Sequence, residues 1–393
     1  MEVFGKFELL TRLARGGMAE VFLARQRGDG RFERLVVIKR VLPHLAEDER
    51  FIELFLEEAR IAALLDHPNI VPIYDLGRVD VLGAGAGASD ETLPSYFLAM
   101  PYIHGVTVQT LGHESDARGV RLSLGDTCTI IRQALGGLCY AFEHRGLDGL
   151  PLRVVHRDVT PSNLMVNDQG RVQVLDFGIA TVHDSDLATG SSRRGKVTYM
   201  SPEQVRSEEL DCRSDLFSLA VIFWELLTYK RLFKADSDLQ TLRTIVEGPY
   251  PDVREEAPEV PEAIADVVRG ALQREREARF ADARSMRNAL DAAMRRCGIE
   301  ASVEALGARV REVVGDVLAD RQQLVDRANA GQLSSEQPTR VEVPAGPSGG
   351  SRRSRASGSL GTRGHAARRR RRRRLVALLA GALLLVGGGI TAA

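Results

Sequence analysis

The sequence has few cysteines and no secretion signal at its start. Only four of its 393 residues are cysteine (Cys128, Cys139, Cys212 and Cys297), and none has the spacing of a metal-binding pair. They fall within apolar or helical stretches, so we expect reduced core thiols rather than disulfides or a zinc site, which favours the cytosol for this part of the chain. The N-terminus lacks a basic segment followed by an apolar run, so no cleavable signal peptide is expected.

The sequence also lacks net charge, but its charges are unevenly placed. Between Arg340 and Arg374 there are 12 arginines and one acid, Glu342, so the remainder is acidic. With 44% hydrophobic and 27% charged residues the chain has ordinary globular composition, and it is long enough for more than one typical domain.

Two acids and an amide, Asp158, Asn163 and Asp176, fall within 19 residues of sequence, on loops next to the short β-like runs 164–166 and 172–175. Phosphoryl transfer needs one carboxylate to orient and deprotonate an attacking hydroxyl, and hard oxygen ligands to hold Mg²⁺ against the phosphates. Asp158 fits the first role, and Asn163 and Asp176 fit the second as metal ligands.

The stretches 154–163 (VVHRDVTPSN) and 175–178 (LDFG) closely resemble the H-R-D-L-x-x-x-N and D-F-G motifs of eukaryotic-like Ser/Thr protein kinases. Matches recur in the family's order from Phe7 to Met294. The resemblance implies an α+β, two-lobed fold, with a small antiparallel β-sheet N-lobe (7–103) and a mainly helical C-lobe (104–294). It also implies ATP and Mg²⁺ as cofactors, and proteins as substrates.

A hairpin near the N-terminus resembles the loop that covers the phosphates in kinases. Residues 7–13 and 20–24 look like strands with small residues between them, which lets backbone N–H groups approach phosphate oxygens. Of the family's G-x-G-x-x-G pattern only the middle glycine is present. The implied nucleotide-binding residues are Leu13, Ala14, Arg15, Gly16, Gly17, Met18, Ala19 and Val21, with Ala14 and Ala19 at the outer glycine places.

The β-branched run 34–39 resembles the family's V-A-I-K strand, with Val37 in the alanine place and Lys39 directed to the α- and β-phosphates. The next segment, about 45–65, is expected to be helical, with an apolar stripe that includes Glu58. Because an unpaired buried carboxylate is costly, we predict that Glu58 pairs with Lys39.

Two further strands are expected at 70–79 and 95–100, joined by the Gly/Ala-rich loop 83–89. The following residues resemble the hinge that contacts adenine, with Met100 as gatekeeper. Pro101 has no N–H, but the family uses only a carbonyl at that place. The implied adenine contacts are Met100, Pro101 and Ile103.

The expected helical lobe contains four features around the catalytic loop. Ser123 is a plausible N-cap for a helix to about Arg145, and 216–227 is an apolar helix typical of a buried position. The resemblance implies that Asp215 braces the catalytic loop. It also implies a buried ion pair between Glu203 and Arg279.

The activation segment, 176–203, ends in S-P-E, which resembles the family's A-P-E. The resemblance implies that Arg157 binds a phosphorylated residue of this segment, and a homodimer is a candidate arrangement for its autophosphorylation. Candidate phosphorylation sites are Thr181, Ser185, Thr189, Ser191, Ser192 and Thr198.

One pair of residues departs from the family. Most members have lysine two residues after the catalytic aspartate and threonine in the segment before Y-x-x-P-E, whereas this chain has Thr160 and Lys196 at those places. We predict exchanged roles: Lys196 reaches the γ-phosphate, and the Thr160 hydroxyl bonds toward Asp158.

The C-terminal quarter differs in composition from the rest. A helical extension, 295–330, either packs on the C-lobe with its part 303–325 or stands apart, and a disordered basic linker, 331–374, follows it. Residues 375–393 carry no charge and as a helix would span about 28 Å, so they are a candidate transmembrane helix.

Seven consecutive arginines, 368–374, precede this candidate span. By the positive-inside rule they predict a single-pass membrane protein with its kinase domain in the cytoplasm. Nucleic-acid binding by the arginines would leave the adjoining apolar segment unexplained, so no nucleic-acid partner is expected.

The sequence therefore predicts an ATP-dependent Ser/Thr protein kinase that signals from the cytoplasmic face of a membrane. The missing glycines and the changed catalytic loop favour one alternative, a pseudokinase scaffold. A second alternative, a kinase of small molecules, is disfavoured by the activation segment.

Overall fold

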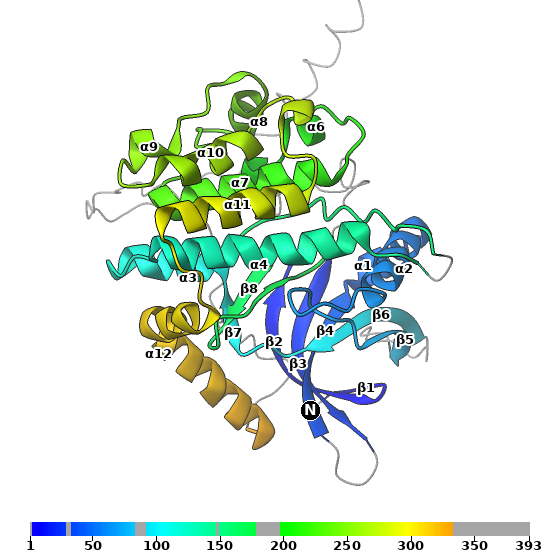
Figure 1. Cartoon of the computed structure of the whole chain (residues 1–393). Helices are drawn as coiled ribbons and strands as arrows, with labels where there is room; N and C mark the ends of the chain where they lie inside the picture. The colour runs from blue at the N-terminus through cyan, green and yellow to red at the C-terminus, as the bar shows by residue number, and fades with distance from the viewer. Residues whose placement is uncertain (1, 29–32, 83–91, 147–148, 178–196, 333–393) are drawn as a thin grey trace, which may run out of the picture. The chain divides into compact units, whose positions relative to one another are not determined.

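The structure is a computed structural model, and the residues it describes lie within the unit Met1–Gly346. Figure 1 shows a β-sheet lobe built from the N-terminal residues and a helical lobe built from the later ones, so the predicted α+β, two-lobed arrangement is confirmed. The described residues are 2–28, 33–82, 92–146, 149–177 and 197–332.

The N-terminal lobe contains a six-stranded antiparallel sheet with strand order β1-β2-β3-β4-β6-β5. Phe4 and Phe7 each pack edge to face on Phe97, with ring centroids 5.3 and 5.4 Å apart, and anchor one end of the sheet. The sequence pattern does not predict β1. The strands are β1 (Glu2–Phe4), β2 (Phe7–Arg15), β3 (Ala19–Arg27), β4 (Glu33–Val41), β5 (Asp75–Leu82) and β6 (Thr92–Pro101).

The helical stretch predicted over about 45–65 consists of two helices in the structure, α1 (Pro43–Ala46) and α2 (Glu49–Ala63). The break lies at Asp48, whose carboxylate accepts a hydrogen bond from Phe51 N at 3.1 Å and so caps a new helix. Phe51, on the apolar face of α2, then packs in the same cluster as Leu98 of β6.

The predicted strand 70–79 begins only at Asp75. Ile70 is buried in the core of the helical lobe and makes one parallel bridge to Val174, while Tyr74 N donates to Ala99 O at 2.7 Å. The apolar run here packs between the lobes and does not extend the sheet.

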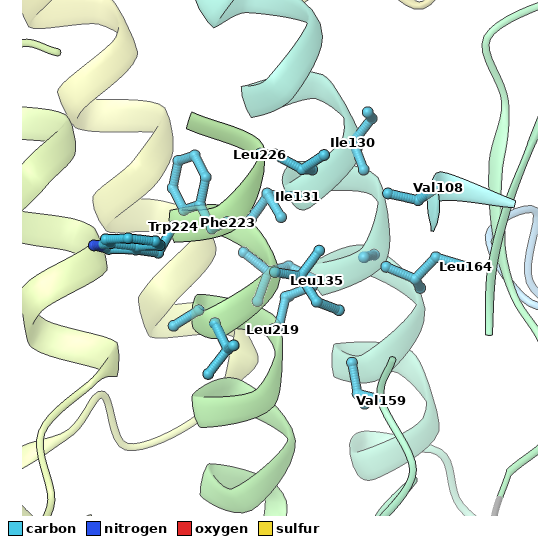
Figure 2. Packing of buried hydrophobic residues seen from close by; sticks show 14 of the residues in the cluster. Val108, Ile130, Ile131, Leu135, Val159, Leu164, Leu219, Phe223, Trp224 and Leu226 are labelled. Carbon is cyan, nitrogen blue, oxygen red and sulfur yellow. The ribbon is translucent and has the colours of Figure 1, made fainter. Parts of the chain in front are cut away.

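The helical lobe is built around α7 (Cys212–Thr228), which is buried on nearly all sides as its apolar sequence predicts. Figure 2 shows its Leu219 and Phe223 among the same buried side chains as Ile131 and Leu135 of α4. The other elements of this lobe are α3 (Val108–Ala117), α4 (Leu124–Glu143), α6 (Pro202–Val205), α8 (Asp238–Glu247), α9 (Val253–Glu256), α10 (Glu262–Ala271), α11 (Ala283–Cys297) and the 3-10 turns η3 (Val197–Tyr199) and η4 (Arg276–Ala278).

The N-cap predicted for α4 is confirmed. Ser123 Oγ accepts from Asp126 N at 3.0 Å, and Asp126 Oδ2 accepts from Ser123 N at 2.9 Å, which completes a capping box. The cap fixes the residue at which α4 begins. Buried side chains of α4 then pack in the same core as Val159 and Leu164, on either side of the catalytic loop.

A small antiparallel sheet is formed by β7 (Gly105–Thr107), which follows the N-terminal lobe in the chain, and by β8 (Leu164–Asn167) and β9 (Val172–Val174), which follow α4. The loops before β8 and after β9 carry the candidate catalytic residues. Val159 and Leu164 are buried in the main core with the α4 side chains, as Figure 2 shows, so the loop before β8 is held from below by apolar packing.

The C-terminal extension packs on the lobes and does not stand apart. It forms α12 (Val303–Asn329), with a non-helical break at Val314. Its first half packs closely on the turn between β8 and β9: a Cβ placed on Gly170, where φ is +82°, would lie 1.9 Å from Val303 O, and one on Gly307 would lie 2.6 Å from Gln169 C.

Within the described residues, no helix is both long and apolar enough to serve as a membrane span. The predicted linker from 333 onward and the predicted span, 375–393, lie outside the described residues. The same holds for the loop 83–89.

Candidate active site

The catalytic loop is a set of tight turns closed by its own polar groups. Asn163 Nδ2 donates to Asp158 O at 2.8 Å and to Asp158 Oδ2 at 3.0 Å, and Asn163 N donates to Thr160 O at 3.0 Å. These bonds hold the Asp158 carboxylate and the Asn163 amide side by side. The predicted base and the first predicted metal ligand are thus in one hydrogen-bonded unit.

Asp215, at the start of α7, braces this loop as the resemblance implies. Its two carboxylate oxygens accept from His156 N at 2.7 Å and Arg157 N at 2.8 Å. Burial raises the pKa of the Asp215 carboxyl, and the two backbone donors oppose that shift. Because both oxygens are used, the brace fixes the backbone immediately before Asp158.

His156 ties the catalytic loop to the loop that carries Asp176. The fully buried imidazole bonds through Nε2 to Leu175 O at 2.8 Å, and its Nδ1 accepts from Asp158 N at 3.2 Å. Its ring also packs on Phe177, with centroids 4.8 Å apart. A second link runs from Leu175 N to Asn163 O at 2.8 Å, so the two predicted metal ligands belong to directly bonded loops.

Asp176 is the point where the two lobes meet in the site. Its Oδ1 lies 3.0 Å from Nζ of Lys39 in β4. Its backbone has φ of +43°, and Arg157 has φ of +67°, conformations that cost non-glycine residues energy and are concentrated at functional sites. The loops on both sides of the site are therefore held in conformations that the surrounding contacts impose.

The residues present suit magnesium. An amide oxygen from Asn163 and carboxylate oxygens from Asp176 are hard donors, and Mg²⁺ is typically held by one or two carboxylates together with waters and substrate phosphates. The described residues contain no cluster of three or more His, Cys, Asp or Glu side chains that would make an all-protein metal cage. Asn163 and Asp176 are the residues that would hold the ion, and this role stays a prediction.

Four of the predicted nucleotide contacts share one face of the sheet. In the strand register Val21 pairs with Lys39 and Val37 pairs with Met100, so these four side chains lie on the same side. The hairpin tip is tight, with Gly16 N donating to Ala19 O at 2.8 Å. Of the remaining predicted contacts, Leu13, Ala14 and Arg15 end β2, Gly17 and Met18 complete the turn, Ala19 begins β3, Pro101 ends β6 and Ile103 follows it.

A small cavity of about 20 Å³ is lined in part by Met100, the predicted gatekeeper, and by Leu98, Asp176 and Phe177. This volume holds little more than one water. Met100 thus lines a space too small for a ligand, and its role as gatekeeper stays a prediction.

The end of the activation segment is fixed by the predicted buried ion pair. Arg279 donates to Glu203 through Nη1 and Nη2 at 2.7 and 2.8 Å, and the two side chains are 0% and 3% exposed. Burial alone raises the pKa of Glu203, but the hydrogen bonds and charge of Arg279 and a 2.6 Å bond from Ser214 Oγ outweigh it and hold that pKa below its usual value.

Gln204 is a positioning residue that the sequence analysis missed. Its Oε1 accepts from Ser201 N at 2.9 Å, and its Nε2 donates to Arg157 O at 2.7 Å. The pattern S-x-x-Q at 201–204 is a capping-box signal for α6 and could have singled it out, but its bond to the catalytic loop is not readable from local sequence.

Some predicted site residues lie outside the described part of the chain, and one has a hydrogen-bond partner that was not expected. The side chain of Glu58, and all of Lys196 and 178–196, lie outside the described residues, so the Lys39–Glu58 pair and the Lys196 role stay predictions. The Thr160 hydroxyl is buried and lies 2.8 Å from Ser162 Oγ, its hydrogen-bond partner within the described structure. The expectation that it bonds toward Asp158 therefore needs a rearrangement of this loop.

Comparisons with known proteins agree with this geometry. The family model described as "Protein kinase domain" matches residues 7–291. The chain is 38% identical over 292 residues to a protein named tyrosine-protein kinase MasK of Myxococcus xanthus, covering 74% of this chain and 43% of that protein. It is 30% identical over 285 residues to serine/threonine-protein kinase PrkC of Bacillus subtilis, covering 72% of this chain and 40% of that protein.

A probable serine/threonine-protein kinase, PknB of Bifidobacterium longum, is 34% identical over 282 residues, which cover 71% of this chain and 38% of that protein. The chain thus spans about two fifths of the length of these relatives. Among solved structures, the PknI kinase domain of Mycobacterium tuberculosis superposes with a TM-score of 0.53 at 23% identity, covering 74% of this chain and 97% of that domain. This last likeness concerns the fold.

Proposed function

Because the chain belongs to the protein kinase family, we propose that it is an ATP-dependent protein kinase that phosphorylates Ser or Thr hydroxyls of proteins. The observation that carries the proposal is the meeting of four groups in one site. Lys39 lies 3.0 Å from Asp176, Asn163 lies 3.0 Å from Asp158, and the loops of Asn163 and Asp176 are bonded at 2.8 Å.

Each residue has a distinct part in the reaction. Asp158 orients the attacking hydroxyl and accepts its proton, and Lys39 neutralises charge on the α- and β-phosphates. Asn163 and Asp176 would hold Mg²⁺, which would supply positive charge to neutralise the phosphates. Asp215 and His156 keep these groups in place through backbone bonds, so the site is organised before substrate arrives.

The proposal also names the residue type that accepts the phosphoryl group, which is Ser or Thr and not Tyr. Relatives named as Ser/Thr kinases support Ser and Thr, whereas the relative from M. xanthus is named a tyrosine kinase. Phosphoamino-acid analysis of the autophosphorylated protein separates the two: we expect phosphoserine or phosphothreonine, and phosphotyrosine alone would overturn the Ser/Thr assignment.

A pseudokinase scaffold is the alternative, since two of the three phosphate-loop glycines are missing and Thr160 replaces the usual lysine. Incubation with labelled ATP and Mg²⁺ should give autophosphorylation in the wild type and none in Asp158→Asn. Equal incorporation of label in both proteins would mean that a contaminating kinase is responsible. No incorporation of label in either protein would support the scaffold.

We also propose that residues 375–393 anchor the protein in a membrane with the kinase domain in the cytoplasm. The support is the uncharged 19-residue segment directly after seven arginines. Deleting 375–393 should release an active enzyme into the soluble fraction, whereas deleting 334–367, as a control, should leave it in the membrane fraction. Continued membrane fractionation without 375–393 would refute the anchor.

A further inference from the structure

Helix α12 crosses from one lobe to the other, although it lies beyond the residues that the kinase family model matches. Its first half, including Leu306 and Val310, is buried in the core of the helical lobe. Its second half places Val325 and Ala328 in a cluster with Leu10 and Leu23 of the sheet lobe. In Figure 1 the helix runs from beside α3 and β7 toward β2, and the contacts of these elements agree.

The end of α12 is bound to the sheet lobe by a polar contact as well. Arg25 of β3, which is buried, donates through Nη2 to the carbonyl oxygen of Asn329 at 3.1 Å and to its Oδ1 at 3.0 Å. A cationic side chain on the last carbonyl of a helix satisfies an unpaired acceptor and complements the helix dipole. The contact with Arg25 thus caps the C-terminus of α12.

Between its two ends, α12 holds the hinge. The guanidinium of Arg321 donates to the carbonyl of Gly105, where the hinge enters β7. Burial lowers the pKa of Arg321, and the nearby Tyr102 opposes that shift. This half-buried arginine, directed at a backbone carbonyl, fixes the chain segment that connects the lobes.

The sheet residues that α12 covers lie on the nucleotide side. Leu23 pairs with Val37 and is two residues from Val21, so it shares a face with Val21, Val37 and Lys39. Leu13 and Tyr102 pack on the same cluster. The helix therefore covers the hinge end of the face predicted to hold adenine.

We propose that the second half of α12, residues 315–329, positions the ATP site by tying the hinge and the sheet lobe to the helical lobe. The proposal rests on the proposed function, because it requires that the cleft binds ATP. The tied arrangement is the competent one, since in it Lys39 of the sheet lobe reaches Asp176 of the helical lobe. Arg321 and Ala328 act through the hinge and the sheet, and are positioning residues.

Loosening this tie should weaken nucleotide binding. Without it the lobes sample further orientations about the hinge, and the apparent dissociation constant rises in proportion as the competent fraction falls. Once ATP and Mg²⁺ are bound, the chemical step uses the same residues in such a variant as in the wild type. The effect should therefore appear in the ATP KM and Kd, and not in kcat.

The test compares the full-length protein with Arg321→Ala and with Ala328→Glu, which places a charge against Leu10 and Leu23. Calorimetry with a non-hydrolysable ATP analogue and Mg²⁺ should give a Kd raised at least about tenfold in both variants, with kcat within about twofold of wild type. Arg321→Lys, which retains a cationic donor for Gly105 O, should recover most of the affinity. Gln323→Ala, an exposed change on the same half of the helix, is the matched control.

An unchanged Kd in both variants would overturn the proposal, and so would tighter binding, which would mean that α12 obstructs the cleft. An equal loss in Gln323→Ala would point to general destabilisation and would also count against it. Wild-type protein that binds no nucleotide would instead refute the proposed function on which this inference rests.

Discussion

Lys39 Nζ and Asp176 Oδ1 lie 3.0 Å apart, one in the sheet lobe and the other on a loop of the helical lobe. The contact brings the candidate phosphate ligand next to a candidate Mg²⁺ ligand. A site formed across two lobes in this way depends on how the lobes are held, and a change on either side should affect catalysis.

Lys39→Met should reduce phosphoryl transfer by at least about 10²-fold, because the phosphate contact and the charge beside Asp176 are lost together. The measurement is the initial rate of autophosphorylation with labelled ATP and Mg²⁺. Lys6→Met is the control, since Lys6 pairs with Asp75 near the sheet's outer edge, and this variant should keep its activity. Near-normal turnover in Lys39→Met would show that another lysine performs this role.

Arg279→Met should destabilise the protein by about 3–5 kcal/mol at neutral pH, because it leaves the buried Glu203 carboxylate without its counter-charge. Denaturant unfolding measures the difference. Arg269→Met, which removes an exposed arginine paired with Asp252 and Glu262, should leave the free energy of unfolding nearly unchanged. A loss in Arg279→Met no larger than in this control would contradict a buried pair.

The same pair predicts a pH dependence. The folded-state pKa of Glu203 is lowered, so its pairing adds stability above the unfolded-state pKa of about 4.3, and that stability is lost as the pH falls through the folded-state pKa. The gap between wild type and Arg279→Met should therefore narrow below about pH 4. A gap that stays constant through this range would show that Arg279 acts by packing alone.

How far the sequence predicts this architecture depends on whether a signal is local. The capping box at Ser123 and the apolar helix within α7 are written in consecutive residues, and both are confirmed. The strand predicted over 70–74 fails because β-like composition does not say whether a partner strand is available. Likewise, the apolar stripe of α12 predicts a buried face but not which lobe covers it, and its contacts with Leu10 and Leu23 join residues about 300 positions apart.

In the candidate site, too, residues within local motifs could be predicted, whereas partners brought together by the fold could not. Asp158, Asn163 and Asp176 could be predicted because each sits in a motif whose chemistry is specific. Gln204 could not be linked to Arg157 O, and Thr160 could not be linked to Ser162, because those partners are set by how the loops fold.

Phosphorylation of the activation segment should raise activity. Arg157 Nε is buried and has no hydrogen-bond partner among the described residues, which is a costly arrangement unless an anionic group meets it. Phosphatase-treated wild-type protein should show a lag in ATP-dependent activity that shortens with enzyme concentration, as expected if copies phosphorylate one another. Arg157→Ala should show no such activation, and full activity of treated wild type without a lag would contradict the prediction.

Thr160 and Lys196 stand at places where most members of the family have lysine and threonine, respectively. One positive charge near the γ-phosphate is preserved if Lys196 takes the place of the usual catalytic-loop lysine, because electrostatic stabilisation of the transition state is a large catalytic term. Lys196→Ala should then lower kcat by about 10²-fold or more with little change in the ATP KM, the pattern of an interaction made mainly in the transition state.

The double exchange Thr160→Lys with Lys196→Thr distinguishes this role from a general effect of charge. Thr160 is buried and bonded to Ser162, so Thr160→Lys alone should disturb the loop and lower kcat. In the double variant the lysine returns to the usual family position, and much of the kcat lost in Lys196→Ala should be recovered. Lys234→Ala, outside the activation segment, is the control for a lost lysine. An unchanged kcat in Lys196→Ala would show that this lysine does not act on the γ-phosphate.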